Sequence, residues 1–516
     1  MPVPAQRSVP VPVLLAAFVA ISLITRWISL VVPILDIDES AHIVGSWEML
    51  RGRLLYTEFV NNKPPLLYVY YAVAQAVFGR SLIGVHAFTA IVTVPLTALG
   101  VSAFFHHARR GVLAGATFLV YSAAFIGHDM LASHAEVPMM LAAAWAVVLL
   151  RDESGATRPA RTLASGALFG IAFLFKYQVA VWLPGIALVV GWTAWRRQGT
   201  GRSLGSVAAL IAGALVPPLL AWLWFRARGG DAMLVYWTLR SNLAYSSNPI
   251  RLAEALERFA SYAVPFAIVT APLWWGTWRL ASSDEPPYRR WLAWTLVMLS
   301  LPPVMLGFRF YPHYFIQLYV PLALAAAPWL EGHLAPPATR AGRRVAAWSL
   351  IMLVGFMAST AFLYFGTTRV YRERDPVFHL VADRLRADAC APRATLFVWG
   401  YAPPFYYYAD MPAASRFVVM AQSRLTGYMS GNLARVRDPR EAKADIVPAH
   451  WDWLMDDLER NRATFILDTA PAGIYRWNQY PVDDYPRLRD YLASHYDLVD
   501  TVGRVHVYRR RGCAGG

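Results

Sequence analysis

Charged side chains are scarce in this chain of 516 residues, because Asp, Glu, Lys and Arg together make up only 16% of it. Soluble globular proteins contain about 25%. Hydrophobic residues make up 57%, and long apolar runs recur between residues 12 and 365. This composition excludes an ordinary soluble domain and is typical of helices that cross a membrane. We therefore predict an α-helical polytopic membrane protein.

Cysteine is nearly absent, which excludes a disulfide-rich scaffold. The chain has two cysteines, Cys390 and Cys513, and the sequence leaves open whether they form a disulfide or two free thiols. It also lacks a Walker loop, a glycine-rich dinucleotide motif and an internal repeat. These absences give no support to a nucleotide-binding enzyme.

Lysine is also rare, since 45 of the 48 basic residues are arginines. The net charge of +15 comes mainly from arginines in short segments between the apolar runs: 109–110, 151–161, 196–202, 279–290 and 340–344. This is the positive-inside pattern of membrane proteins, so the basic charge requires no nucleic-acid partner.

The charge pattern predicts a topology. Eleven spans are expected near residues 12–34, 82–105, 111–127, 136–150, 163–176, 178–195, 204–225, 260–278, 291–307, 314–330 and 345–365. The first run is too long for a signal-peptide core and lacks a cleavage site, so we expect it to be retained. The run 65–79 would reach only about 22 Å as a helix, short of the ~30 Å hydrocarbon core, and is interpreted as juxtamembrane or re-entrant. Eleven spans place the N-terminus inside and the C-terminal part outside.

Residues 366–516 contain more charge and shorter apolar runs, which predicts a small α/β domain after a transmembrane domain of residues 1–365. Strands are expected at 395–399, 416–420, 464–467 and 504–508, and helices at 451–460 and 485–495.

Three acids, Asp36, Asp38 and Glu39, directly follow the first apolar run. Acids so close to hydrocarbon are costly and by default indicate a functional site. The segment from the acids to about Leu50 is predicted to be helical, and Asp36 or Asp38 could cap that helix. A cap explains one or two of the acids, but not three. A carboxylate here could accept a proton from an attacking hydroxyl, and the spacing of Asp36 and Asp38 could equally suit a divalent cation.

Two of the three lysines lie on the predicted outer face. Lys63 precedes two prolines, and Lys176 ends a predicted span. An ammonium group is suited to a phosphate oxygen deep in a cleft. The alternative is that each lysine extends to the membrane interface without binding a ligand.

A late aromatic segment on the same face offers donors for a phosphate or diphosphate. It contains Arg309, Tyr311, His313 and Tyr314. An interfacial aromatic belt would have the same composition.

A second outer segment carries His128, Asp129, His134 and Glu136. Known zinc motifs are spaced more tightly, so substrate positioning by Asp129 or Glu136 is favoured over a metal. Because these outer segments come from distant parts of the sequence, their convergence on one face is what a single site requires.

These motifs resemble the GT-C membrane glycosyltransferases, in the branch of protein O-mannosyltransferases and lipid A aminoarabinose transferases. Asp38-Glu39 is similar to the acidic pair of that branch, and Lys63-Pro64-Pro65-Leu66 to its proline segment. Lys176 matches a lysine that ends a later span, and His313-Tyr314 a late aromatic loop. The resemblance covers most of residues 12–330.

The resemblance implies transfer of a sugar from a polyprenyl-phosphate donor to a hydroxyl of a lipid, glycan or protein, with inversion at the anomeric carbon. Asp38 would be the general base, while Lys63, Lys176 and Arg309 would hold the departing phosphate. The extra acid Asp36 leaves open which aspartate is the base. No cofactor is expected to be required, although a divalent metal stays possible. The implied location is a bacterial inner membrane, with the site and the C-terminal domain on the periplasmic side.

Three other classes of protein fit parts of the sequence. The weakest of them is a membrane metalloenzyme, which a chelator would inactivate. A transporter or flippase of a lipid-linked sugar would need alternating access, usually with repeated halves, and the sequence has no such repeat. A non-catalytic assembly subunit would use its C-terminal domain to bind a partner, and replacement of Asp38 would then have no effect on function.

Overall fold

The computed structural model describes residues 9–124, 128–247, 250–334, 339–427 and 443–513. The chain forms two compact units. The first unit comprises Met1–Leu35, Lys63–Leu223 and Leu252–Phe362, and the second comprises Asp36–Asn62, Trp224–Arg251 and Leu363–Gly516. Two stretches of the first half of the chain therefore belong to the same unit as the C-terminal residues.

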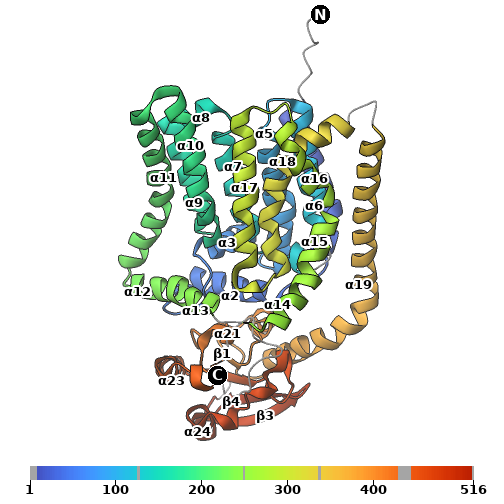
Figure 1. Cartoon of the computed structure of the whole chain (residues 1–516). Helices are drawn as coiled ribbons and strands as arrows, with labels where there is room; N and C mark the ends of the chain where they lie inside the picture. The colour runs from blue at the N-terminus through green and yellow to red at the C-terminus, as the bar shows by residue number, and fades with distance from the viewer. Residues whose placement is uncertain (1–8, 125–127, 248–249, 335–338, 428–442, 514–516) are drawn as a thin grey trace, which may run out of the picture. The chain divides into compact units, whose positions relative to one another are not determined.

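The first unit is helical over its described residues (Figure 1). Its longer helices are α1 (Val11–Thr25), α3 (Leu66–Phe78), α5 (Val94–Ala103), α6 (Ala108–Ala124), α7 (Glu136–Leu149), α9 (Pro159–Phe173), α10 (Trp182–Gln198), α11 (Thr200–Arg226), α17 (Pro287–Met305), α18 (Ile316–Leu334) and the first part of α19 (Arg340–Arg386). Shorter helices include α4 (Leu82–Phe88), α8 (Glu153–Thr157), α14 (Leu252–Arg258), α15 (Val264–Val269) and α16 (Ala271–Arg279).

Four helical segments of this part of the chain are long and apolar enough to cross a membrane: Leu82–Ala103, Tyr177–Gln198, Thr200–Arg226 and Pro287–Phe308. Val11–Thr25, Leu66–Phe78 and Glu136–Leu149 are shorter apolar helices. The predicted class of membrane protein is thus supported, while the number of eleven spans stays a prediction. Residues 125–127, at the end of one predicted span, lie outside the described residues.

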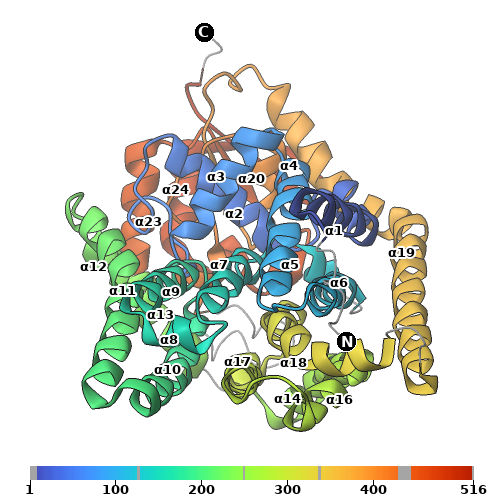
Figure 2. The ribbon, with the colours of Figure 1, turned by 90° about the horizontal axis from the view of Figure 1, so that it is seen from above.

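Within the first unit, helix α18 contacts α6, α16 and α17 (Figure 2). Most of its side chains are buried. By contrast, α11 exposes Leu215, Leu219 and Leu220, as expected for a helix that faces lipid. Because α9 and α11 cross closely at Gly166 and Gly213, a Cβ atom at either glycine would meet a backbone oxygen of the other helix at 2.1 Å. Small residues at such crossings are a common device of membrane helices.

The second unit contains a four-stranded sheet in the order β1-β2-β4-β3. Strands β1 (Leu396–Trp399) and β2 (Phe465–Asp468) are parallel, whereas β4 (Val505–Arg510) runs antiparallel to both β2 and β3 (Tyr496–Val502). Helices α20 (Pro404–Ala409), α23 (Pro448–Asn461) and α24 (Pro486–His495) lie between the strands in sequence, and α2 (Ile37–Leu50), α12 (Asp231–Val235) and α13 (Ser241–Ser247) come from the first half of the chain. A disulfide joins Cys390 to Cys513.

Most of the predicted C-terminal elements are confirmed, because β1, β2, β4, α23 and α24 all lie where the sequence patterns place them. The strand predicted at 416–420 is wrong. The backbone N–H of Arg416 donates to the Asp457 carboxylate at 2.9 Å, and the N–H of Phe417 donates to the Ser415 hydroxyl at 3.2 Å. Side chains therefore take the place of a neighbouring strand. Strand β3 was not predicted, since it follows α24 without a turn signal and carries polar residues.

The segment that follows α2 is attached to the C-terminal residues of the same unit. The Arg53 guanidinium donates to the carbonyl of Ala413 at 2.7 Å, and the Val60 N–H donates to the carbonyl of Arg416 at 3.0 Å. On α2 itself, the Trp47 ring stacks on Tyr407 with centroids 5.7 Å apart.

Candidate functional site

The three N-terminal acids have different environments in the second unit. Asp36 is the N-cap of α2, and its carboxylate accepts the Asp38 N–H at 2.8 Å. Glu39 completes a capping box by accepting the Asp36 N–H at 3.4 Å. Such a box satisfies backbone donors at the start of a helix. The helix cap thus accounts for Asp36 and Glu39, which leaves Asp38 as the best candidate for a proton acceptor.

Asp38 lies in the first turn of α2 and is half-buried. Its Oδ1 accepts a hydrogen bond from the Tyr401 hydroxyl at 3.2 Å. Tyr401 follows strand β1 closely, at the carboxyl end of the parallel pair. Sequence reasoning missed this tyrosine, because the two residues are separated by 363 positions and no local pattern links them.

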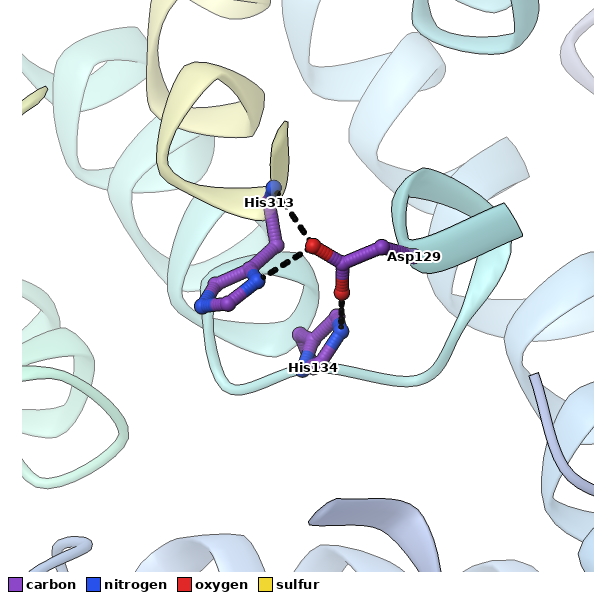
Figure 3. Close-up of side chains that lie close together, drawn as sticks. All are labelled: Asp129, His134 and His313. Atoms are coloured by element: carbon purple, nitrogen blue, oxygen red, sulfur yellow. Dashed lines mark hydrogen bonds and ion pairs between the residues drawn. The ribbon is translucent and has the colours of Figure 1, made fainter. Parts of the chain in front are cut away.

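In the first unit, two segments that were predicted to lie on the outer face converge on a largely buried cluster of Asp129, His134 and His313 (Figure 3). One oxygen of Asp129 contacts His134 Nε2, and the other lies 2.8 Å from His313 Nδ1. The His313 backbone N–H also donates to Asp129 Oδ2 at 3.3 Å. The two imidazole rings are stacked, with centroids 4.1 Å apart.

The cluster is held by short helical turns. Asp129 lies in η3 (His128–Leu131), His134 precedes α7 by one residue, and His313 lies in η9 (Pro312–Phe315). Burial opposes ionisation of Asp129, but the charges and hydrogen bonds of the two histidines hold its pKa well below the ordinary value. Burial lowers the pKa of His313, against the attraction of the carboxylate. An ionised carboxylate therefore lies between two imidazoles.

A buried ion pair lies beside this cluster in sequence and in space. Lys176 Nζ is 2.7 Å from Oε1 of Glu136, the first residue of α7. The same ammonium group lies 5.1 Å from the centre of the Tyr314 ring, and Tyr314 directly follows His313. The structure thus brings together residues of three predicted outer segments: 128–136, Lys176 and 309–314.

Two further cations lie near the aromatic segment. Arg309 is 1% exposed, and its carbonyl accepts a hydrogen bond from Arg258 at 3.4 Å. Arg258 pairs with Glu254 at 2.7 Å and lies 5.1 Å from the centre of the Tyr311 ring. The Tyr311 ring is in turn nearly parallel to that of His313, at 5.6 Å. Sequence analysis missed Arg258 and Glu254, although their i,i+4 spacing on α14 was a visible signal.

The segment of Lys63 is attached to that of Lys176. Lys63 is half-buried and lies two residues before Pro65, the N-cap of α3. The N–H of Leu66 donates to the carbonyl of Leu174 at 3.1 Å. The two lysines predicted to bind phosphate therefore come from neighbouring segments of one unit. The side chain of His128 lies outside the part of the chain that the structure describes in detail.

Comparison with known proteins shows a family similar to part of the chain and a fold similar to nearly all of it. Residues 62–222 match the family described as dolichyl-phosphate-mannose-protein mannosyltransferase. No curated protein sequence matches the chain. Among solved structures, ArnT from Cupriavidus metallidurans bound to undecaprenyl phosphate is 15% identical with a TM-score of 0.59, and the match covers 98% of this chain and 100% of that one. The apo form of the same protein gives 15% identity and a TM-score of 0.56, with 97% and 98% of the two chains covered.

The family match and the shared fold confirm the resemblance to the GT-C membrane glycosyltransferases. The family match covers residues 62–222 and therefore includes Lys63, Asp129, Glu136 and Lys176. The fold of ArnT extends over nearly the whole chain. Residues 62–222 are thus similar to a family of protein mannosyltransferases, and the chain as a whole has the fold of ArnT.

Proposed function

We propose that the protein is an inverting glycosyltransferase that moves a sugar from a polyprenyl-phosphate donor to a hydroxyl group. The observation that carries the proposal is the convergence, in one unit, of Lys176, Arg309 and the segment of Lys63. A buried ammonium group and a buried guanidinium group suit the oxygens of a phosphate. The ArnT structure with undecaprenyl phosphate supports a lipid phosphate as the donor's carrier.

In the proposed reaction, the acceptor oxygen attacks the anomeric carbon while the bond from that carbon to the phosphate oxygen breaks. The acceptor's proton passes to Asp38, which acts as the general base. The electron pair of the broken bond leaves with the lipid phosphate, where Lys63, Lys176 and Arg309 stabilise the developing negative charge. A single displacement of this kind inverts the anomeric centre.

The other site residues have supporting roles in this proposal. Tyr311, His313 and Tyr314 form the wall beside the cations, and Glu136 positions Lys176 through the 2.7 Å ion pair. Asp129 orients His313 through the 2.8 Å contact. Asp36 and Glu39 keep the first turn of α2 in place, so that Asp38 is presented at a fixed position.

The location is part of the same proposal. Under the positive-inside rule, the site and residues 366–516 lie on the periplasmic side of a bacterial inner membrane. Residues 1–365 then act as the catalytic transmembrane domain. The acceptor is a hydroxyl of an envelope lipid, glycan or protein that is reached from that side.

The test uses purified protein in lipid, supplied with radiolabelled polyprenyl-phosphate sugars and an envelope acceptor fraction. We expect wild type to release lipid phosphate and to transfer label, and we expect Asp38→Asn and Lys63→Ala to lose most of this activity. Lys443→Ala is the matched control, because that lysine is exposed and pairs with Asp484.

The outcomes separate the alternatives. Loss of transfer in Asp36→Asn but not in Asp38→Asn would move the role of base to Asp36. A wild-type protein that carries a lipid-linked sugar across vesicles without consuming it would overturn the glycosyltransferase proposal in favour of a transporter.

A further inference from the structure

We propose that Asp129, His134 and His313 form a binding site for one divalent transition-metal ion, with Zn²⁺ as the ion that suits them best. This site goes beyond the proposed glycosyl transfer, for which the sequence implies no required metal. The sequence alone favoured substrate positioning by Asp129, because it offered two histidines and an acid at loose spacing. The structure adds a third ligand, because it brings His313 against Asp129 from a segment 184 residues further along the chain.

The first argument is geometric. The three side chains each offer one ligand atom, and these atoms all lie within 4.8 Å of one another. Atoms bound to one zinc ion at about 2.0–2.2 Å lie roughly 3.4 Å apart in tetrahedral geometry. A shift of about 1 Å or less in each side chain would therefore convert the hydrogen-bonded cluster into a coordination sphere. Figure 3 shows both imidazoles directed at the same carboxylate.

The second argument is chemical. Two imidazoles and one carboxylate are a common set of protein ligands for catalytic zinc, which leaves a fourth position for water or for another oxygen. Zinc prefers such nitrogen and oxygen donors, whereas magnesium and calcium prefer oxygen alone.

The third argument is that the ligands are held in place before any ion binds. The His134 side chain is 1% exposed and that of His313 is 10% exposed. The His134 N–H donates to the carbonyl of Ala132 at 2.8 Å, and the Tyr71 hydroxyl donates to the carbonyl of Ser133 at 3.0 Å. The Tyr311 ring is nearly parallel to that of His313 and also packs against it, with centroids 5.6 Å apart. Ligands restrained in this way lose little conformational entropy on binding.

A bound ion would connect two segments of the first unit, those around residues 128–134 and 312–315. The second of these segments also carries Tyr314, which contacts Lys176. The ion would therefore fix the wall of the proposed phosphate site, and its main effect would be on stability. An ion that binds only the folded protein stabilises it, by an amount that grows with the logarithm of the ratio of ion concentration to dissociation constant. This stabilisation can be measured without any substrate.

The experiment uses the full-length protein purified in detergent without chelator. Metal content is measured by mass spectrometry, and the unfolding temperature is measured after stripping with chelator and again after reloading with Zn²⁺. We expect close to one zinc per chain and a rise in unfolding temperature of several degrees on reloading. We expect both effects to be lost in His134→Ala and His313→Ala. The control is His107→Ala, which replaces an exposed histidine outside the cluster.

A second measurement does not depend on variants that fold. Wild-type protein loaded with Co²⁺ should show the visible absorption of a tetrahedral or five-coordinate cobalt site, and Zn²⁺ should abolish it. The proposal is overturned if stripped wild type binds neither ion, or if His313→Ala retains the same metal content as wild type. Because these readouts need no sugar donor, failure of the glycosyltransferase proposal would leave them unaffected.

Discussion

Replacement of Lys176 by methionine should destabilise the first unit strongly, because it leaves a buried charge without its partner. Lys176 Nζ lies 2.7 Å from Glu136 Oε1, with side-chain exposures of 12% and 0%. Removal of one partner of a buried ion pair typically costs about 3–5 kcal/mol. Loss of the contact with the Tyr314 ring adds about 0.5–2 kcal/mol. We therefore expect Lys176→Met to lower the free energy of unfolding by roughly 3.5–7 kcal/mol.

The double variant Lys176→Met/Glu136→Gln should recover most of this loss, because neither residue is then charged. In a double-mutant cycle, we expect a coupling energy between the two positions at or above the upper end of the usual range of about 0.5–3 kcal/mol. The assay is reversible denaturation in mixed micelles, followed by tryptophan fluorescence. The control is Lys443→Met, whose exposed pair with Asp484 should contribute less than about 1 kcal/mol.

Two results would refute this reasoning. One is a Lys176→Met variant as stable as the Lys443→Met control, and the other is a double variant in which the two single effects simply add. The same proteins also separate stability from function. If Lys176 binds the leaving phosphate, the double variant should fold and yet transfer little sugar.

Three further predictions concern the second unit. Cys390→Ser should lower its stability by about 5 kcal/mol, because the bond closes a stretch of 123 residues; a reductant should produce the same loss of unfolding temperature in wild type and none in the variant. Burial raises the pKa of Asp468 to about 6, because the folded protein favours the protonated carboxyl. The stability that the protonated form contributes is therefore complete below about pH 4 and is lost as the pH rises through 6. Asp468→Asn should abolish this dependence and raise the unfolding temperature at pH 7; unchanged pH profiles would contradict the assignment. Tyr401→Phe should reduce sugar transfer by roughly 10- to 100-fold without unfolding the protein, because it removes a hydrogen bond to the proposed base. The control is Tyr475→Phe, which removes the hydroxyl of a tyrosine whose ring packs on Tyr401.

Local patterns in the sequence predicted those features that depend on neighbouring residues. The apolar runs indicated the membrane helices, and the amphipathic segments indicated α23 and α24. The acids after the first run were correctly placed at the start of a helix, but the sequence could not divide their roles. Only the capping geometry assigns Asp36 and Glu39 to the helix end.

Features that depend on distant contacts could not be predicted. The backbone N–H groups of Arg416 and Phe417 donate to the Asp457 and Ser415 side chains rather than to a neighbouring strand, so high β-propensity did not produce a strand at 416–420. His313 and Asp129 lie 184 residues apart, and the sequence suggested both as site residues without revealing that they touch. The disulfide was one of two open possibilities, and the 6.2 Å separation of the Cα atoms of Cys390 and Cys513 fits its formation.

The composite origin of the second unit has a consequence for biosynthesis. Arg53 bonds to Ala413, and Tyr401 to Asp38, across gaps of 360 and 363 residues. At about 5–20 residues per second, a ribosome needs roughly 20–70 s to cover that distance. During this time the segment 36–62 has left the ribosome without its permanent neighbours. A chain that stops before β1 would therefore lack the hydrogen-bond donor to Asp38, even though every residue of the first unit had been made.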